Sequence, residues 1–355
     1  MNSATTISPD SAASPRKLKF GLRESGTLLG LLLICVMFSF LTPTFLTEAN
    51  LVNILQQSSI NACLAIGMTL VIITGGIDLS VGSTAAFSAV ISASMLSSGV
   101  PPILAVVLGL GLGVACGCIN GLLITFGQLQ PFIVTLGTLS LFRAFALIYT
   151  NGNPIMGLPQ GFRSVILGKI GLLPVPVLLV GACAIAAWVL LRKTPMGEYL
   201  LSVGGNEEAS RISGVPIRLT KIVAYSINGF LAALAAIILI GRLGAAEPVL
   251  GTLWELDAIA AAAIGGASLM GGKASISGTV IGALILGALR NGLTLMNVQA
   301  FYQLLATGVI ILIAVFVDRA ARGSGSNASR RDRGSGRAPS TGRRNDSAIG
   351  ASPDG

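Results

Sequence analysis

Long apolar runs, most of them close to twenty residues, recur along this chain and limit what it can fold into. The first run extends from Thr27 to Leu46 and has about the length of helix that a bilayer requires. Of the 355 residues, 53% are hydrophobic and only 10% are charged, and the mean hydropathy is +0.82. We therefore expect an all-α integral membrane protein.

The apolar runs predict about ten transmembrane helices, with both termini on the cytoplasmic side. The expected spans are 27–46, 58–75, 85–100, 103–126, 131–148, 172–191, 223–240, 255–270, 280–296 and 301–317. In this arrangement the basic loops all fall on one side, which the positive-inside rule identifies as the cytoplasm. Eight spans with two re-entrant segments fit nearly as well.

The charge distribution supports this topology and argues against a nucleic-acid partner. The net charge is +9, but 12 of the 23 Lys and Arg residues lie in the first 25 and the last 37 residues. Basic ends of this kind set topology and attract anionic lipid. We expect a cytoplasmic basic segment over 1–25, a transmembrane domain over 26–320 and a disordered basic tail over 321–355.

The residue composition does not indicate a catalytic site or a cofactor-binding site. The chain has no His, and its five cysteines all fall inside apolar segments, so neither a metal site nor a catalytic triad is expected. The closest approach to a phosphate-binding loop, Ala267 to Ala274, has Ala at the first Gly position and at the Ser/Thr position. Lys273 is therefore interpreted as an anchor at the cytoplasmic edge.

A polar island between two apolar runs, Thr194 to Val215, has the signals of a short surface helix. Asn206 can cap a first turn that carries Glu207 and Glu208, and Gly214 can end the helix. Five basic residues lie in or beside the island, which places the loop 192–221 in the cytoplasm. An ordinary amphipathic connector is the alternative interpretation.

Two glycine-rich segments, GGIDLSVGS at 75–83 and GGKASISGT at 271–279, interrupt apolar sequence and predict broken helices. Asp78 lies in the first. An ionisable residue at membrane depth faces a cavity or a partner, or caps the helix that starts near Leu79; both roles remain open. The similar Gly and Ser placement leaves a duplicated half as an option. The glycines expected to shape these regions are Gly75, Gly76, Gly82, Gly265, Gly266, Gly271 and Gly272.

Other polar residues also interrupt the expected spans. Arg143 requires a carboxylate partner or a route to water. Glu255 and Asp257 begin an expected span at its outer end, where they favour the helix dipole or form a polar rim for a hydroxylated solute.

Five segments together resemble the ribose-type permeases of bacterial ATP-binding cassette importers, in the branched-chain amino acid/ribose permease superfamily. They are LVNILQQSSINACLAIGMTLVIITGGIDLSVGS (51–83), INGLLIT (119–125), QPFIVTLGT (130–138), PMGEYLLSVGGNEEASRISGV (195–215) and DAIAAAAIGGASLMGGKASISGTVIGA (257–283). These segments extend over about two thirds of the chain in the family's order. The basic tail after Arg322 has no counterpart in the family pattern.

The resemblance implies a permease subunit of the inner membrane that performs no bond chemistry. A cytoplasmic ATPase subunit would bind ATP and Mg²⁺, a periplasmic binding protein would deliver a monosaccharide or polyol, and a second permease chain, as a homodimer, would complete the pathway. The polar island would be the coupling helix that docks into the ATPase. The residues implied in coupling are Gly197, Glu198, Gly204, Asn206, Glu207, Glu208, Arg211 and Gly214.

Polar side chains within the spans suit a hydroxylated solute, or else cap helices and bridge spans. The pathway candidates are Asp78, Ser80, Asn120, Thr135 and Asn291. The competing class is an ion-coupled secondary transporter of a small polar solute, in which Asp78, Glu255 and Asp257 would be the coupling sites.

Overall fold

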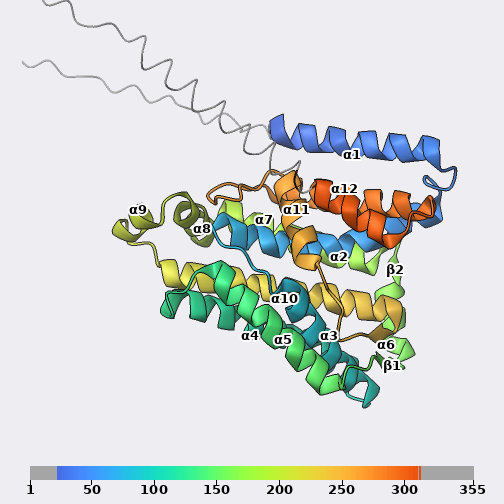
Figure 1. Ribbon diagram of the computed structural model, residues 1–355, viewed down its shortest axis with the longest axis horizontal. Helices are drawn as coiled ribbons and strands as arrows, with labels where there is room; N and C mark the ends of the chain where they lie inside the picture. The colour runs from blue at the N-terminus through green and yellow to red at the C-terminus, as the bar shows by residue number, and fades with distance from the viewer. Residues whose placement is uncertain (1–21, 311, 313–355) are drawn as a thin grey trace, which may run out of the picture.

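Helices make up nearly all of the regular structure. The computed structural model describes residues 22–310 and 312 (Figure 1). Its helices are α1 (Leu22–Leu41), α2 (Glu48–Ile73), α3 (Val81–Ser97), α4 (Pro102–Phe126), α5 (Pro131–Thr150), α6 (Gln160–Leu167), α7 (Val175–Lys193), α8 (Pro195–Gly205), α9 (Glu207–Ile212), α10 (Ile217–Leu243), α11 (Trp254–Ile264) and α12 (Ile276–Leu295). A further apolar helix, Ala300–Ile310, follows α12. The expected all-α membrane class is confirmed.

Within the described part of the chain, four two-residue strands join loops at the ends of these helices. β1 (Ile155–Met156) pairs antiparallel with β4 (Ala245–Ala246), with Ile155 opposite Ala246. β2 (Lys169–Ile170) pairs with β3 (Leu173–Pro174) in a tight hairpin. The β1–β4 pair ties the loop after α5 to the loop after α10, at the end of the bundle opposite α8 and α9 (Figure 1).

The centre of the molecule is α2, which the other helices surround. Every residue from Ser58 to Ile73 is buried, and α2 packs against α7, α10, α11 and α12. By contrast, α4, α5 and α7 bury less than a third of their most apolar windows and turn large apolar side chains outward. Outward apolar surface of this kind suits lipid or another membrane-embedded chain.

Small residues let α4 approach α10 closely. A Cβ atom at Gly113 would overlap the carbonyl oxygen of Gly229, and one at Gly117 would overlap the carbonyl oxygen of Tyr225. Helix pairs in membranes gain van der Waals contact through such small residues. The glycine spacing of this span therefore fixes which of its faces meets α10.

Both glycine-rich segments interrupt helices. Residues 74–80 separate α2 from α3, and residues 265–275 separate α11 from α12. The expected span 255–270 is wrong as a continuous helix, because α11 ends at Ile264 and Gly266 adopts a positive φ of 89°. With 11 residues, α11 is about 16 Å long, roughly half the hydrocarbon thickness of a bilayer.

The expected count of ten spans is not confirmed. Among the described residues, six helices are long and apolar enough to cross a membrane, namely α2, α4, α5, α7, α10 and α12. Shorter apolar helices cover Ser25–Leu41, Val81–Ser97 and Ala300–Ile310. The predictions for the extreme N-terminus and for the tail 321–355, including the side on which the termini lie, fall outside the described residues.

Candidate functional site

The polar loop 192–221 forms two helices where the sequence predicted one. α9 starts after Asn206, whose Oδ1 accepts a hydrogen bond from the Ala209 N–H at 2.9 Å, as predicted. It ends before Gly214, which adopts a φ of 79°. The additional helix, α8, was missed, although Thr194 followed by Pro195 is a typical start signal and the Thr194 hydroxyl accepts from the Gly197 N–H.

The charges of α9 are held in surface ion pairs. Glu207 accepts from Lys221 of α10 at 2.8 Å, and Arg211 lies 3.1 Å from Glu208 and 3.9 Å from Glu207. Exposed pairs contribute about 0–1 kcal/mol each, so they order the surface more than they stabilise the fold. Glu198 of α8 is exposed, and Ile212, at the end of α9, is 81% exposed. A small charged surface with one apolar side chain is therefore presented to the surroundings.

The end of α8 lies against both helix breaks. A Cβ atom at Gly204 would overlap the carbonyl oxygen of Ile73, the last residue of α2, and would come 2.6 Å from the backbone nitrogen of Gly272. The Gly272 N–H in turn donates to the Ile73 carbonyl at 2.9 Å. We call Ile73, Gly204 and Gly272 the glycine junction. It connects the α8–α9 loop directly to the segment 74–80 and to the segment 265–275.

The other expected glycines support these close approaches. Gly197 packs onto the backbone of α7 at Leu190 and Leu191. Positive φ angles occur at Gly75, Gly266, Gly271 and Gly272, whereas Gly76, Gly82 and Gly265 lie where a Cβ would overlap a neighbouring group. Most of these contacts are with backbone atoms, which cannot move aside as a side chain can.

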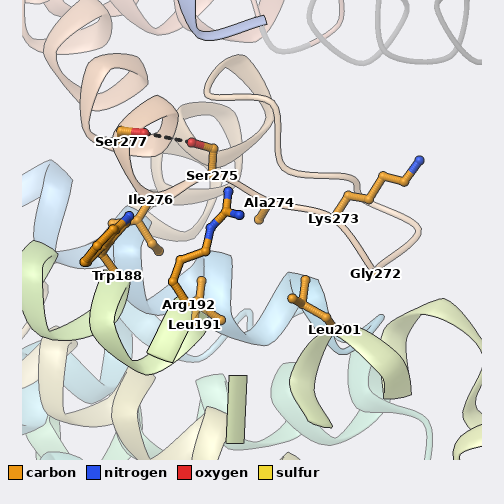
Figure 2. A pocket seen from close by; sticks show the side chains of 10 residues that line it. All are labelled: Trp188, Leu191, Arg192, Leu201, Gly272, Lys273, Ala274, Ser275, Ile276 and Ser277. Carbon is orange, nitrogen blue, oxygen red and sulfur yellow. Dashed lines mark hydrogen bonds between the residues drawn. The ribbon is translucent and has the colours of Figure 1, made fainter. Parts of the chain in front are cut away.

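A cavity of about 260 Å³ opens beside the glycine junction (Figure 2). Its walls are α7, Leu201 of α8 and the segment 272–277. Figure 2 shows Arg192 pointing toward that segment, while Lys273 extends away from the other labelled side chains. Lys273 is exposed, which agrees with its interpretation as an anchor at this edge of the bundle.

Four of the five pathway candidates come together at the first break. Asp78 is 2% exposed, and its Oδ1 accepts from the backbone N–H of Ser80 at 2.9 Å and from the Ser80 hydroxyl at 2.6 Å. Asn120 of α4 donates to the Ser80 hydroxyl at 2.8 Å, and Thr135 of α5 donates to the Ile77 carbonyl at 3.2 Å. This buried network fastens the start of α3 to α4 and α5.

Two members of this network were missed by sequence reasoning. Asn228 of α10 donates to Asp78 Oδ2 at 2.8 Å, and the Tyr225 hydroxyl donates to the Ile77 carbonyl at 3.4 Å. Asn228, like Asn120, is an amide side chain inside an apolar span. The pattern that identified Asn120 could therefore also have identified Asn228. With these two residues, the first break is held from α4, α5 and α10 at once.

The remaining intramembrane polar residues lie in separate contacts. Asn291 exchanges two hydrogen bonds of 2.9 Å with Asn50 of α2, away from the network around Asp78. Asp257 forms an ion pair with Arg290 of α12. Arg143 donates to the backbone carbonyls of Pro248 and Leu250, so it reaches carbonyl groups where a carboxylate or water was expected.

Comparison with known proteins places this geometry among transport subunits. Residues 50–315 match the family described as branched-chain amino acid transport system / permease component. The ribose import permease protein RbsC of Bacillus subtilis strain 168 is 48% identical over 301 residues, which cover 84% of this chain and 93% of that protein.

Two further relatives are named for other sugars. The D-allose transport system permease protein AlsC of Escherichia coli K12 is 37% identical over 319 residues, covering 89% of this chain and 98% of that protein. The galactose/methyl galactoside import permease protein MglC of the same strain is 34% identical over 327 residues, covering 87% and 97%. No solved structure matches the chain.

Proposed function

The chain belongs to the family of branched-chain amino acid transport system permease components, and on this premise we propose that it translocates a ribose-like monosaccharide inward across the bacterial inner membrane. The resemblance drawn from the motifs is thereby confirmed. The relatives are sugar importer permeases, so this chain is a multi-pass transport subunit and not an enzyme. Pentoses, hexoses and polyols remain the proposed substrate class.

In this proposal the chain works with two kinds of partner. A cytoplasmic ATPase subunit binds ATP and Mg²⁺, and a periplasmic binding protein brings the sugar to the end of the bundle opposite α8 and α9. A second copy of the chain completes the pathway, and the outward apolar faces of α1, α4, α5 and α7 are available to that copy and to lipid. The basic tail has no assigned part in transport.

The single observation that carries the proposal is the glycine junction. A displacement of α8 by a docked ATPase acts at Gly204 on the end of α2 and on Gly272. The two breaks that these residues adjoin, 74–80 and 265–275, lead into α3 and α12. Packed interfaces switch between discrete arrangements and do not deform continuously, so a small shift of α8 can be converted into a change of the whole pathway.

Within the pathway we propose a positioning role for Asp78, Ser80, Asn120 and Thr135. Their polar atoms bond to one another and to backbone, and all four residues are at most 2% exposed. In this arrangement they hold the broken helix in shape and leave contact with the solute to other residues. Asn291, bonded to Asn50, bridges α12 to α2.

The ion-coupled secondary transporter is not favoured. Asp78 accepts hydrogen bonds from three side chains and one backbone N–H, and Asp257 is paired with Arg290. A coupling carboxylate must gain and lose an ion during each cycle, which suits a group with fewer fixed partners. The family membership points in the same direction.

Reversing the charges of α9 is expected to abolish uptake without preventing insertion. The double change Glu207→Lys and Glu208→Lys removes the pairs with Lys221 and Arg211 and turns an acidic turn basic. Because exposed ion pairs contribute little to folding, the protein still reaches the membrane. The measurement is uptake of radiolabelled D-ribose in cells that also express the ATPase and the binding protein.

The matched control for this double variant is Glu247→Lys, an exposed acidic residue at the opposite end of the bundle. It should import sugar at the parent rate. Parent-rate uptake by the inserted α9 double variant would remove the coupling assignment.

A further inference from the structure

A polar cavity of about 490 Å³ lies between α2, α10, α11 and α12, far from the α8–α9 loop. Its polar and aromatic lining residues are Gln56, Gln57, Asn61, Arg242, Trp254 and Arg290. We propose that this cavity is a transient binding site for a neutral monosaccharide at the outer side of the permease. The inference rests on the proposed function and deepens it by naming where the sugar enters the chain.

The position of the cavity suits an entry site. Arg242 is 25 residues after Ile217, the first residue of α10, so it lies about 37 Å along that helix from the end that adjoins α9. Gln57 lies in the first half of α2 and Asn61 near its middle, whereas its last residue, Ile73, is in the glycine junction. The cavity and the α8–α9 loop are therefore at opposite ends of the same two helices.

The lining offers polar groups that have no hydrogen-bond partner among the residues that the structure describes. Asn61 is 7% exposed, and its side chain makes no hydrogen bond to any other described residue. Gln56 and Gln57 are half-buried and, within residues 22–310, are likewise without a side-chain partner. These three amides line the cavity, and their polar atoms are not among the fully enclosed unsatisfied atoms of the described residues, so they are open to water or to a ligand. A ligand that both donates and accepts hydrogen bonds would satisfy them.

The charged residues of the lining are held in place by contacts outside the cavity. Arg290 is paired with Asp257, which is 3% exposed, and Arg242 donates to the side-chain Oδ1 of Asn53 at 3.3 Å. The Arg290–Asp257 pair is neutral as a unit, so Arg242 supplies the one net charge of the lining. Fixed guanidinium groups are donors of defined direction, suited to neighbouring hydroxyls.

Trp254 completes a combination that fits a ring sugar. It begins α11, is half-buried, and offers an aromatic surface against which the apolar C–H face of a sugar can pack. Amides, which donate and accept, match the hydroxyls around the ring. The volume falls in the range of about 300–1,000 Å³ that is usual for small-molecule sites.

The test replaces one amide of the lining and measures transport in the complete complex. Gln57→Leu keeps the size of the side chain and removes its hydrogen-bonding groups. Uptake of radiolabelled D-ribose should fall at least about tenfold, while ATPase activity stimulated by the sugar-loaded binding protein stays at the parent level. Gln57→Asn, which keeps the amide, should recover much of the uptake.

The matched control is Gln299→Leu, an exposed glutamine that does not line the cavity, and it should import at the parent rate. Asn61→Leu risks misfolding because Asn61 is buried, so the half-buried Gln57 carries the test. If the parent complex imports none of D-ribose, D-allose or D-galactose, the proposed function fails. If the parent imports one of them and Gln57→Leu imports it equally fast, the cavity is not a sugar site.

Discussion

A Gly204→Ala variant is expected to import sugar at a small fraction of the parent rate, whereas Gly205→Ala should import normally. The added methyl group at Gly204 has no room, because it would overlap the Ile73 carbonyl oxygen and crowd the Gly272 nitrogen. At Gly205 the same methyl group meets no atom within 4 Å. The two variants therefore differ in steric contact at the glycine junction while sharing residue type, helix and chemical change.

The size of this effect follows from overpacking. Forcing a methyl group into a packed site costs about 1–3 kcal/mol, and each 1.4 kcal/mol corresponds to a factor of ten in an equilibrium. If the junction transmits the motion of α8, uptake should fall by about tenfold or more. The measurements are initial uptake in cells and the ATPase activity stimulated by the loaded binding protein, with the amount of inserted permease quantified in parallel.

The comparison of uptake with ATPase activity separates coupling from folding. Loss of uptake with retained ATPase activity and normal insertion is the expected result for Gly204→Ala. Equal uptake by the Gly204→Ala and Gly205→Ala variants would show that the contact with Ile73 and Gly272 does not transmit motion.

The second large effect is expected at Asp78, where the replacement residue decides the outcome. Asp78→Ala leaves the Ser80 N–H and the Asn228 amide buried without their acceptor. Each orphaned donor costs about 1–3 kcal/mol, so the folded yield and the thermal unfolding temperature should drop sharply. Asp78→Asn should be much milder.

Asp78→Asn should be milder than Asp78→Ala because Asn228 has an unused hydrogen-bond acceptor. Its Oδ1 is buried without a partner among the described residues, so a half-turn of the amide can accept from the nitrogen that Asp78→Asn introduces. The remaining oxygen still accepts from the Ser80 N–H. A neutral side chain can thus keep the first break in place.

Uptake by the Asp78→Asn variant distinguishes a positioning carboxylate from an ion-coupling one. For a positioning role, D-ribose uptake should stay within about threefold of the parent, because the hydrogen bonds are replaced. Thermal unfolding of the purified protein provides the folding control. An Asp78→Asn variant that is fully folded and yet transports nothing would show that the charge itself is required.

Local sequence signals predicted local structure well in this chain. Asn206 and Gly214 bound α9 as expected, and the glycines of 75–83 and 271–279 interrupt helices. The sequence prediction missed α8 because it did not use the helix start signal at Thr194 and Pro195. The count of ten spans is not confirmed, since apolar composition alone cannot distinguish a full crossing from a helix such as α11, which ends at Ile264.

Contacts between distant segments could not be derived from one sequence. The glycine junction joins residues 73, 204 and 272, and the carboxylate of Asp78 meets an amide 150 residues away on α10. A polar residue in a span indicates that a hydrogen-bond or charge partner is needed, but which residue is that partner depends on how the helices pack. The same limit applies to the outer cavity, whose lining comes from five separate segments and includes residues that are individually unremarkable in sequence.

Reconstitution in proteoliposomes tests the central claim most directly. The chain, its ATPase and its binding protein are combined, with ATP on the side of α8 and α9 and sugar-loaded binding protein on the other. The account predicts that labelled D-ribose crosses only when ATP, the ATPase and the binding protein are all present, and that an ion gradient has no effect. Transport of sugar by the chain alone, driven by a proton or sodium gradient without ATP, would contradict it.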